Sequence, residues 1–93
     1  AIQLTLPSAT AGTSQNELEI IITLSKEGDV YLNNTKTSLI SLKSELQRML
    51  TESNHKSVTI RGDQNMPYSA FLDALDIAKQ SGAVHVNVAH QTP

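Results

Sequence analysis

The feature that most constrains the fold is a strand, a helix and a second strand that follow one another over residues 57–89. Residues 57–61 place Val58 and Ile60 on one side, as in a strand with one buried face. Apolar residues recur at helical spacing over 67–81, and valines alternate with other residues over 84–89. Two strands joined by a helix in this way are expected to pair in parallel, with a right-handed crossover that lays the helix on the sheet.

The helix expected over 67–81 carries its own start and stop signals. Pro67 fits the first helical position, where its missing N–H costs nothing. Gly82 fits the left-handed position just after a helix. The residues expected to face the core are Phe71, Leu72, Leu75 and Ala78.

The residues before this unit predict a hairpin. Leu18, Ile20, Ile22 and Leu24 alternate with other residues, as expected for the buried side of a strand. A second strand is expected over 30–32, and Asn33 and Asn34 predict a tight turn because asparagine tolerates positive φ. Residues 35–37 could form a short third strand after this turn.

A further helix is expected over 39–52, with Thr37 or Ser38 as its N-cap. Its apolar residues, at helical spacing, are Leu39, Leu42, Leu46, Met49 and Leu50. The order of elements is therefore strand, strand, helix, strand, helix, strand (β-β-α-β-α-β). The predicted fold class is α+β, a two-layer sandwich of one mixed β-sheet with two helices on one face, preceded by a flexible N-terminal tail.

The tail comprises residues 1–16 and the domain residues 17–93. Ile2, Leu4 and Leu6 alternate with polar residues, which favours a short strand, and Pro7 ends the pattern. Small residues follow up to Asn16, as in a flexible linker. The candidates for docking as an added strand on an edge of the sheet are Ile2, Leu4, Leu6 and Pro7. The alternative is that the tail serves only as a spacer.

Composition excludes several classes of protein. The chain has 93 residues, no cysteine and three aromatic residues, namely Tyr31, Tyr68 and Phe71. A net charge of −2 argues against nucleic-acid binding, and the absence of cysteine excludes disulfides. No apolar run reaches the roughly 18 residues of a membrane span. Because the first residue is alanine, we expect a piece of a longer chain.

Residues that could carry chemistry are few: His55, His85, His90, Asp63, Asp73 and Asp76. His85 and His90 are five apart on an expected strand and should face opposite sides, so we expect no metal site. Asp73 and Asp76 share the exposed side of the second helix, where a solvated pair is the simpler interpretation. We expect no catalytic residue and no cofactor, and therefore a binding module and not an enzyme.

Four segments resemble the ExbD/TolR family, in the family's order and spacing. They are Val58–Tyr68, Ala74–Val88, the hairpin Gly28–Asn34 and the Leu-Thr-Leu-Pro segment ending at Pro7. The positions that match the family's motifs are Arg61, Gly62, Asp63, Pro67, Tyr68 and Gly82. Ser41 and Asn87 depart from the family pattern, which often has an acidic residue at the first position and a glycine at the second.

The resemblance implies the periplasmic domain of a single-pass inner-membrane protein in a Gram-negative bacterium. Family members bind an ExbB-like pentameric channel through a transmembrane helix that is not among these residues, and they act with a TonB-like energy transducer. A homodimer is also implied. Residues 30–33 favour the ExbD branch. The alternative is a TolR-like subunit of the Tol-Pal system, which binds peptidoglycan and supports outer-membrane integrity.

Overall fold

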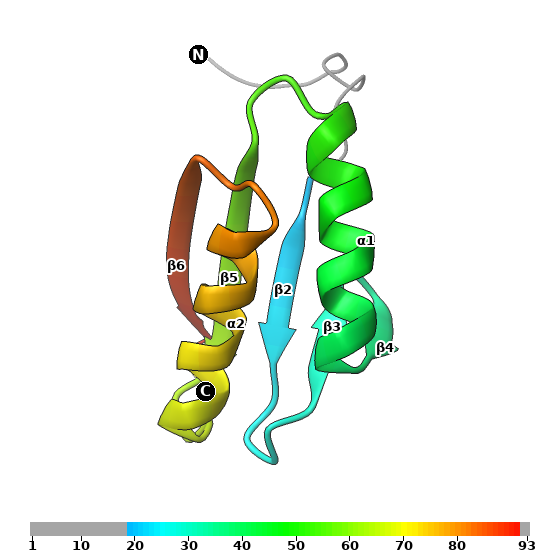
Figure 1. Cartoon of the computed structure of the whole chain (residues 1–93). Coiled ribbons are helices and arrows are strands. Elements are labelled where there is room, and N and C mark those ends of the chain that lie inside the picture. Colours follow the sequence, from blue (N-terminus) through cyan, green and yellow to red (C-terminus); the bar gives the residue numbers. More distant parts are fainter. Residues whose placement is uncertain (1–18, 92–93) are drawn as a thin grey trace, which may run out of the picture.

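The computed structural model describes residues 19–91, and for the last two of these the backbone alone. Its elements are β2 (Ile21–Leu24), β3 (Val30–Leu32), β4 (Thr35–Thr37), α1 (Leu39–Glu52), β5 (Ser57–Asp63), α2 (Tyr68–Gln80) and β6 (His85–Gln91). The strands form one sheet in the order β4-β3-β2-β5-β6 (Figure 1). Pairing is antiparallel from β4 to β2 and parallel from β2 to β6, which confirms a mixed sheet.

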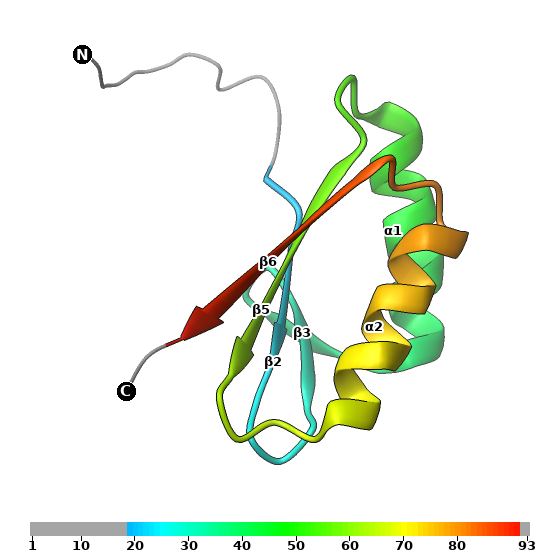
Figure 2. The same ribbon diagram turned by 90° about the vertical axis from the view of Figure 1, so that its left-hand side faces the viewer.

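Both helices lie on the same face of this sheet (Figure 2). The two-layer α+β fold is therefore confirmed, and residues 35–37 form a third strand, β4, that the expected order β-β-α-β-α-β did not include. The opposite face of the sheet has no helix over it among the described residues. It carries the strand residues that alternate with the buried ones, including Thr23, Tyr31, Thr59 and Arg61.

The core lies between the helices and the sheet. Its buried apolar residues are Ile20, Ile22, Leu24, Val30, Leu32, Leu42, Leu46, Leu50, Val58, Ile60, Ala74 and Ala78. The period-2 and helical patterns predicted most of this set, because each pattern marks the side of an element that faces another layer. Leu18 lies outside the described residues.

Helix α1 has the predicted bounds, and both of its ends are satisfied by side chains. The Ser38 hydroxyl accepts a hydrogen bond from the backbone N–H of Ser41 at 3.2 Å, so Ser38 and not Thr37 is the N-cap. No acidic residue is needed at position 41 for this bond. At the other end, Lys56 Nζ donates to the carbonyls of Leu50 at 2.7 Å and Ser53 at 3.0 Å.

Helix α2 differs from the prediction in its bounds, Tyr68–Gln80 and not 67–81, and in the residues that it buries. Pro67 is the N-cap with ψ 134°, so the helix begins one residue later, at Tyr68. Ala78 is fully buried as expected, but Leu72 is 43% exposed and Ala74, which was not expected in the core, is fully buried. Residues 72 and 74 are two apart, which is about 200° around a helix, so Leu72 faces away from the core when Ala74 faces it.

Two strands also differ from the sequence pattern in their bounds. Strand β5 continues beyond residue 61 to Asp63, and β6 starts and ends later than expected, at His85 and Gln91. The two strands pair residue for residue from Ser57↔His85 to Asp63↔Gln91. A seven-residue parallel ladder keeps both strands extended beyond the end of the apolar alternation.

Candidate partner-binding site

The two edges of the sheet are very different. One edge is β4, which has three residues and carries Lys36. The other edge is β6, which has seven residues and contains no lysine, proline or glycine. Short strands, lysine and proline are the usual devices that prevent an edge from pairing with another chain. Among the described residues, β6 is paired on one side alone, so its outer backbone groups form an edge that can accept a strand.

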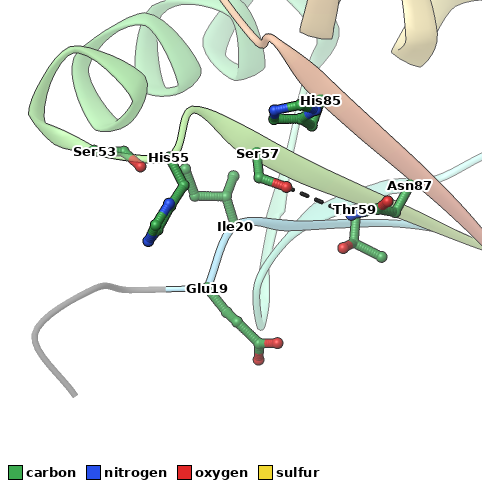
Figure 3. A pocket seen from close by; sticks show the side chains of 8 residues that line it. All are labelled: Glu19, Ile20, Ser53, His55, Ser57, Thr59, His85 and Asn87. Carbon is green, nitrogen blue, oxygen red and sulfur yellow. Dashed lines mark hydrogen bonds between the residues drawn. The ribbon is translucent and has the colours of Figure 1, made fainter. Parts of the chain in front are cut away.

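A polar groove of about 490 Å³ lies on the uncovered face of the sheet and runs from β6 across β5 to the residues before β2 (Figure 3). Its lining residues come from four segments: Glu19, Ile20, Ser53, His55, Ser57, Thr59, His85 and Asn87. The Asn87 side-chain amide donates to the Ser57 hydroxyl at 3.4 Å, linking β6 to β5 across the groove. The family pattern often has a glycine at position 87. The Asn87 side chain is exposed in this structure, so packing around it does not require a residue without a side chain.

The sequence did not predict that His55 and His85 line the same groove. They are far apart in the chain, and both line the groove because the connection after α1 reaches the start of β6, where the Val84 and His85 N–H groups donate to the Lys56 carbonyl. Even so, nowhere in residues 19–91 do three histidine, aspartate or glutamate side chains gather as metal ligands. Asp73 and Asp76 are both exposed on α2, as expected, and Asp76 accepts a hydrogen bond from Gln80 at 2.8 Å.

The motif residues at the end of β5 are mainly structural. Gly62 is buried, and a Cβ at this position would collide with the Met66 thioether. Asp63 forms the turn after the strand, since its carboxylate accepts from the Asn65 N–H at 2.8 Å and its carbonyl from Met66. Arg61 lies on the uncovered face of the sheet, half-buried, beside Thr23 of β2.

The remaining motif residues lie at the ends of α2. Gly82 has φ +111° and follows the helix, as predicted. The N–H groups of Ala83 and Gly82 donate to the carbonyls of Ala78 and Lys79, which is the hydrogen-bond pattern of a glycine-terminated helix. Tyr68, at the other end, is 70% exposed and is therefore available to a partner.

The four tail residues predicted to dock, Ile2, Leu4, Leu6 and Pro7, lie outside the described residues. No helix within residues 19–91 combines the length and the apolar character needed to cross a bilayer.

Comparisons with known proteins identify the family of this chain. The sequence model of the family described as biopolymer transport protein ExbD/TolR matches residues 1–92. One curated relative is the biopolymer transport protein ExbD of Aquifex aeolicus (strain VF5), 32% identical over 88 residues. The match covers 94% of this chain and 64% of that relative, so the chain spans somewhat less than two thirds of the relative's length. The chain belongs to the ExbD/TolR family of biopolymer transport proteins.

Proposed function

We propose that this domain works in the periplasm as part of an inner-membrane motor that uses the proton-motive force, and that it binds an energy transducer of the TonB type. Its task is protein binding and not catalysis. Family membership supports the setting, and the name of the Aquifex relative supports the ExbD branch. The channel partner of such a motor is an ExbB-like pentamer, reached through a transmembrane helix, and the domain acts as a homodimer.

The single observation that carries the binding role is the edge of β6. An extended peptide can add to this edge, since its backbone would pair with groups that have no partner among the described residues. The β4 edge offers three residues and a lysine and is the weaker acceptor. We therefore assign the transducer segment to β6.

A titration followed by amide NMR tests this assignment. A peptide from the periplasmic linker of the cognate transducer is added to the 93-residue chain. Amide shifts concentrated in β6 and at its neighbour β5, with β4 unaffected, support strand addition. A scrambled peptide of the same composition is the control. Absence of shifts at millimolar peptide would contradict the proposal.

The tail supplies an internal competitor for the same edge. Ile2, Leu4 and Leu6 alternate with polar residues, so one face of such a strand is apolar. Replacing Leu4 and Leu6 by serine weakens this competitor, and the transducer peptide should then bind more tightly. Unchanged affinity identifies the tail as a spacer.

The polar groove favours a second candidate function, that of a TolR-like subunit that binds peptidoglycan. Its hydroxyl, amide and imidazole groups could donate and accept hydrogen bonds to a glycan or its peptide. Co-sedimentation with purified sacculi tests this role. The variant Asn87→Leu should lose binding while Gln47→Leu, on the exposed side of α1, keeps it. No sedimentation of the unaltered chain would exclude the role.

A further inference from the structure

Strand β6 has an apolar side that its own domain covers incompletely. Val86 and Val88 pair with Val58 and Ile60 of β5, so their side chains lie on the helix side of the sheet. Val58 and Ile60 are fully buried, but Val88 is 54% exposed. Figure 2 shows the reason, because the C-terminal half of β6 turns away from α2.

Helix α2 contributes a second apolar surface on the same flank. Leu72 and Ser81 are nine residues apart, about two and a half helical turns, so they lie on opposite sides of α2. The Ser81 hydroxyl donates to the Lys43 carbonyl of α1 at 3.5 Å. Leu72 therefore faces away from α1, on the side of β6, and Tyr68 lies one turn before it.

Tyr68 is held in place although it is exposed. Its ring stacks on Phe71 with centroids 6.2 Å apart and an interplanar angle of 23°. Phe71 in turn packs against the buried core. An aromatic ring fixed in this way loses little conformational freedom when a partner covers it, which favours a role in binding.

We infer that these four residues, Tyr68, Leu72, Val86 and Val88, select the segments that the β6 edge accepts. This apolar strip requires an added strand to carry apolar side chains at alternate positions, because side chains alternate between the two faces of a strand. The other face of that strand would lie beside the polar His85 and Asn87. The occupant is thus an extended segment that alternates apolar and polar residues. The inference rests on the strand addition proposed above.

Two designed peptides test the inference against the 93-residue chain. One alternates valine and threonine over seven residues, the other has threonine at all seven positions, and both carry terminal lysines. Binding is measured by amide NMR. The alternating peptide should bind about tenfold more tightly, because its valines become buried against the strip.

The variant Leu72→Ser should weaken binding of the alternating peptide about fivefold and leave the all-threonine peptide nearly unchanged. Leu72→Met, which keeps the apolar volume, should restore the affinity. The matched control is Ile40→Ser, an apolar residue that is 84% exposed on α1, the helix on the opposite flank of the domain from β6 (Figure 1). Urea unfolding of each variant confirms that the domain is folded.

The outcomes separate this inference from the proposed function. If both peptides shift β6 equally, or if Leu72→Ser has no more effect than Ile40→Ser, strand addition stands and selection by the strip is wrong. If neither peptide shifts β6 at millimolar concentration, strand addition itself is wrong, and the selection fails with it.

Discussion

Lys56 has a structural role that its charge and position both explain. Its ammonium group donates two hydrogen bonds to the carbonyls of Leu50 and Ser53 at the end of α1, where few backbone N–H groups are available to pair with carbonyls. The variant Lys56→Met keeps most of the aliphatic chain and removes both bonds. We expect a loss of about 1 kcal/mol in the free energy of unfolding, since the carbonyls can still reach water.

Urea unfolding measures this loss as a lower midpoint at unchanged slope. The control is Lys43→Met, because Lys43 is an exposed lysine on α1 whose side chain forms no hydrogen bond or ion pair within residues 19–91. Both variants remove one positive charge, but only Lys56→Met removes hydrogen bonds. Equal midpoints would therefore show that the hydrogen bonds of Lys56 add nothing to the free energy of unfolding beyond the effect of its charge.

Gly62 illustrates why a motif residue can be structural and not functional. Its missing side chain makes room for Met66, which packs from the turn back onto the core. The variant Gly62→Ala should lower the free energy of unfolding by about 1 kcal/mol, because the flexible methionine can move only in part.

A double-mutant cycle tests this explanation. In a Met66→Ala background the obstacle is absent, so Gly62→Ala should cost much less than in the unaltered chain. The same cost in both backgrounds would contradict the steric account and would point to the backbone of β5 as the cause.

At the scale of elements, α2 packs against α1 and the sheet, and its two fully buried residues are alanines. Ala74 and Ala78 are fully buried and lie four residues apart on one side of α2. The variant Ala78→Leu has no space at this contact and should lose roughly 2 kcal/mol of stability. Gln80→Leu introduces the same residue at an exposed position of the same helix and should leave the unfolding midpoint almost unchanged. Similar midpoints for the two would mean that the helix contact can expand.

The two helices together show how far the periodicity of apolar residues can predict a fold. The spacing of apolar residues predicted α1 with its observed bounds, because Leu42, Leu46 and Leu50 all face the core. In α2 it placed Ala78 in the core correctly, but it chose Leu72 and left out Ala74, since a hydrophobic pattern ranks a leucine above an alanine. The close packing of two helices reverses that ranking, and a single helix's pattern contains no information about its neighbour.

The candidate site was less predictable than the elements, for a similar reason. The alternation of valines predicted β6 as a strand, but its place at the edge depends on the order of all five strands. The groove joins residues from both ends of the domain, among them Glu19 and Asn87. Such a site arises from the topology, so no local pattern predicts it.

For the whole molecule, sheet order predicts a gradient of stability. Strands β2 and β5 are central and carry fully buried residues such as Ile22 and Ile60, whereas β4 and β6 have one neighbour each among the described residues. Amide hydrogen exchange should therefore be slowest in β2 and β5 and faster at both edges, since edge groups open without global unfolding. Equal protection of β6 and β5 in the free chain would mean that something already covers the β6 edge.

A bound transducer segment should change this gradient at one edge only. Pairing closes the outer backbone groups of β6, so exchange there should slow toward the rate in β5, while β4 keeps its free-chain rate. The comparison needs no variant, because β4 is an internal control within the same sheet and the same sample. Slower exchange at β4 would place the partner on the lysine-bearing edge, and slower exchange across all strands would indicate general stabilisation without strand addition. Protection confined to β6 is the pattern that strand addition alone produces.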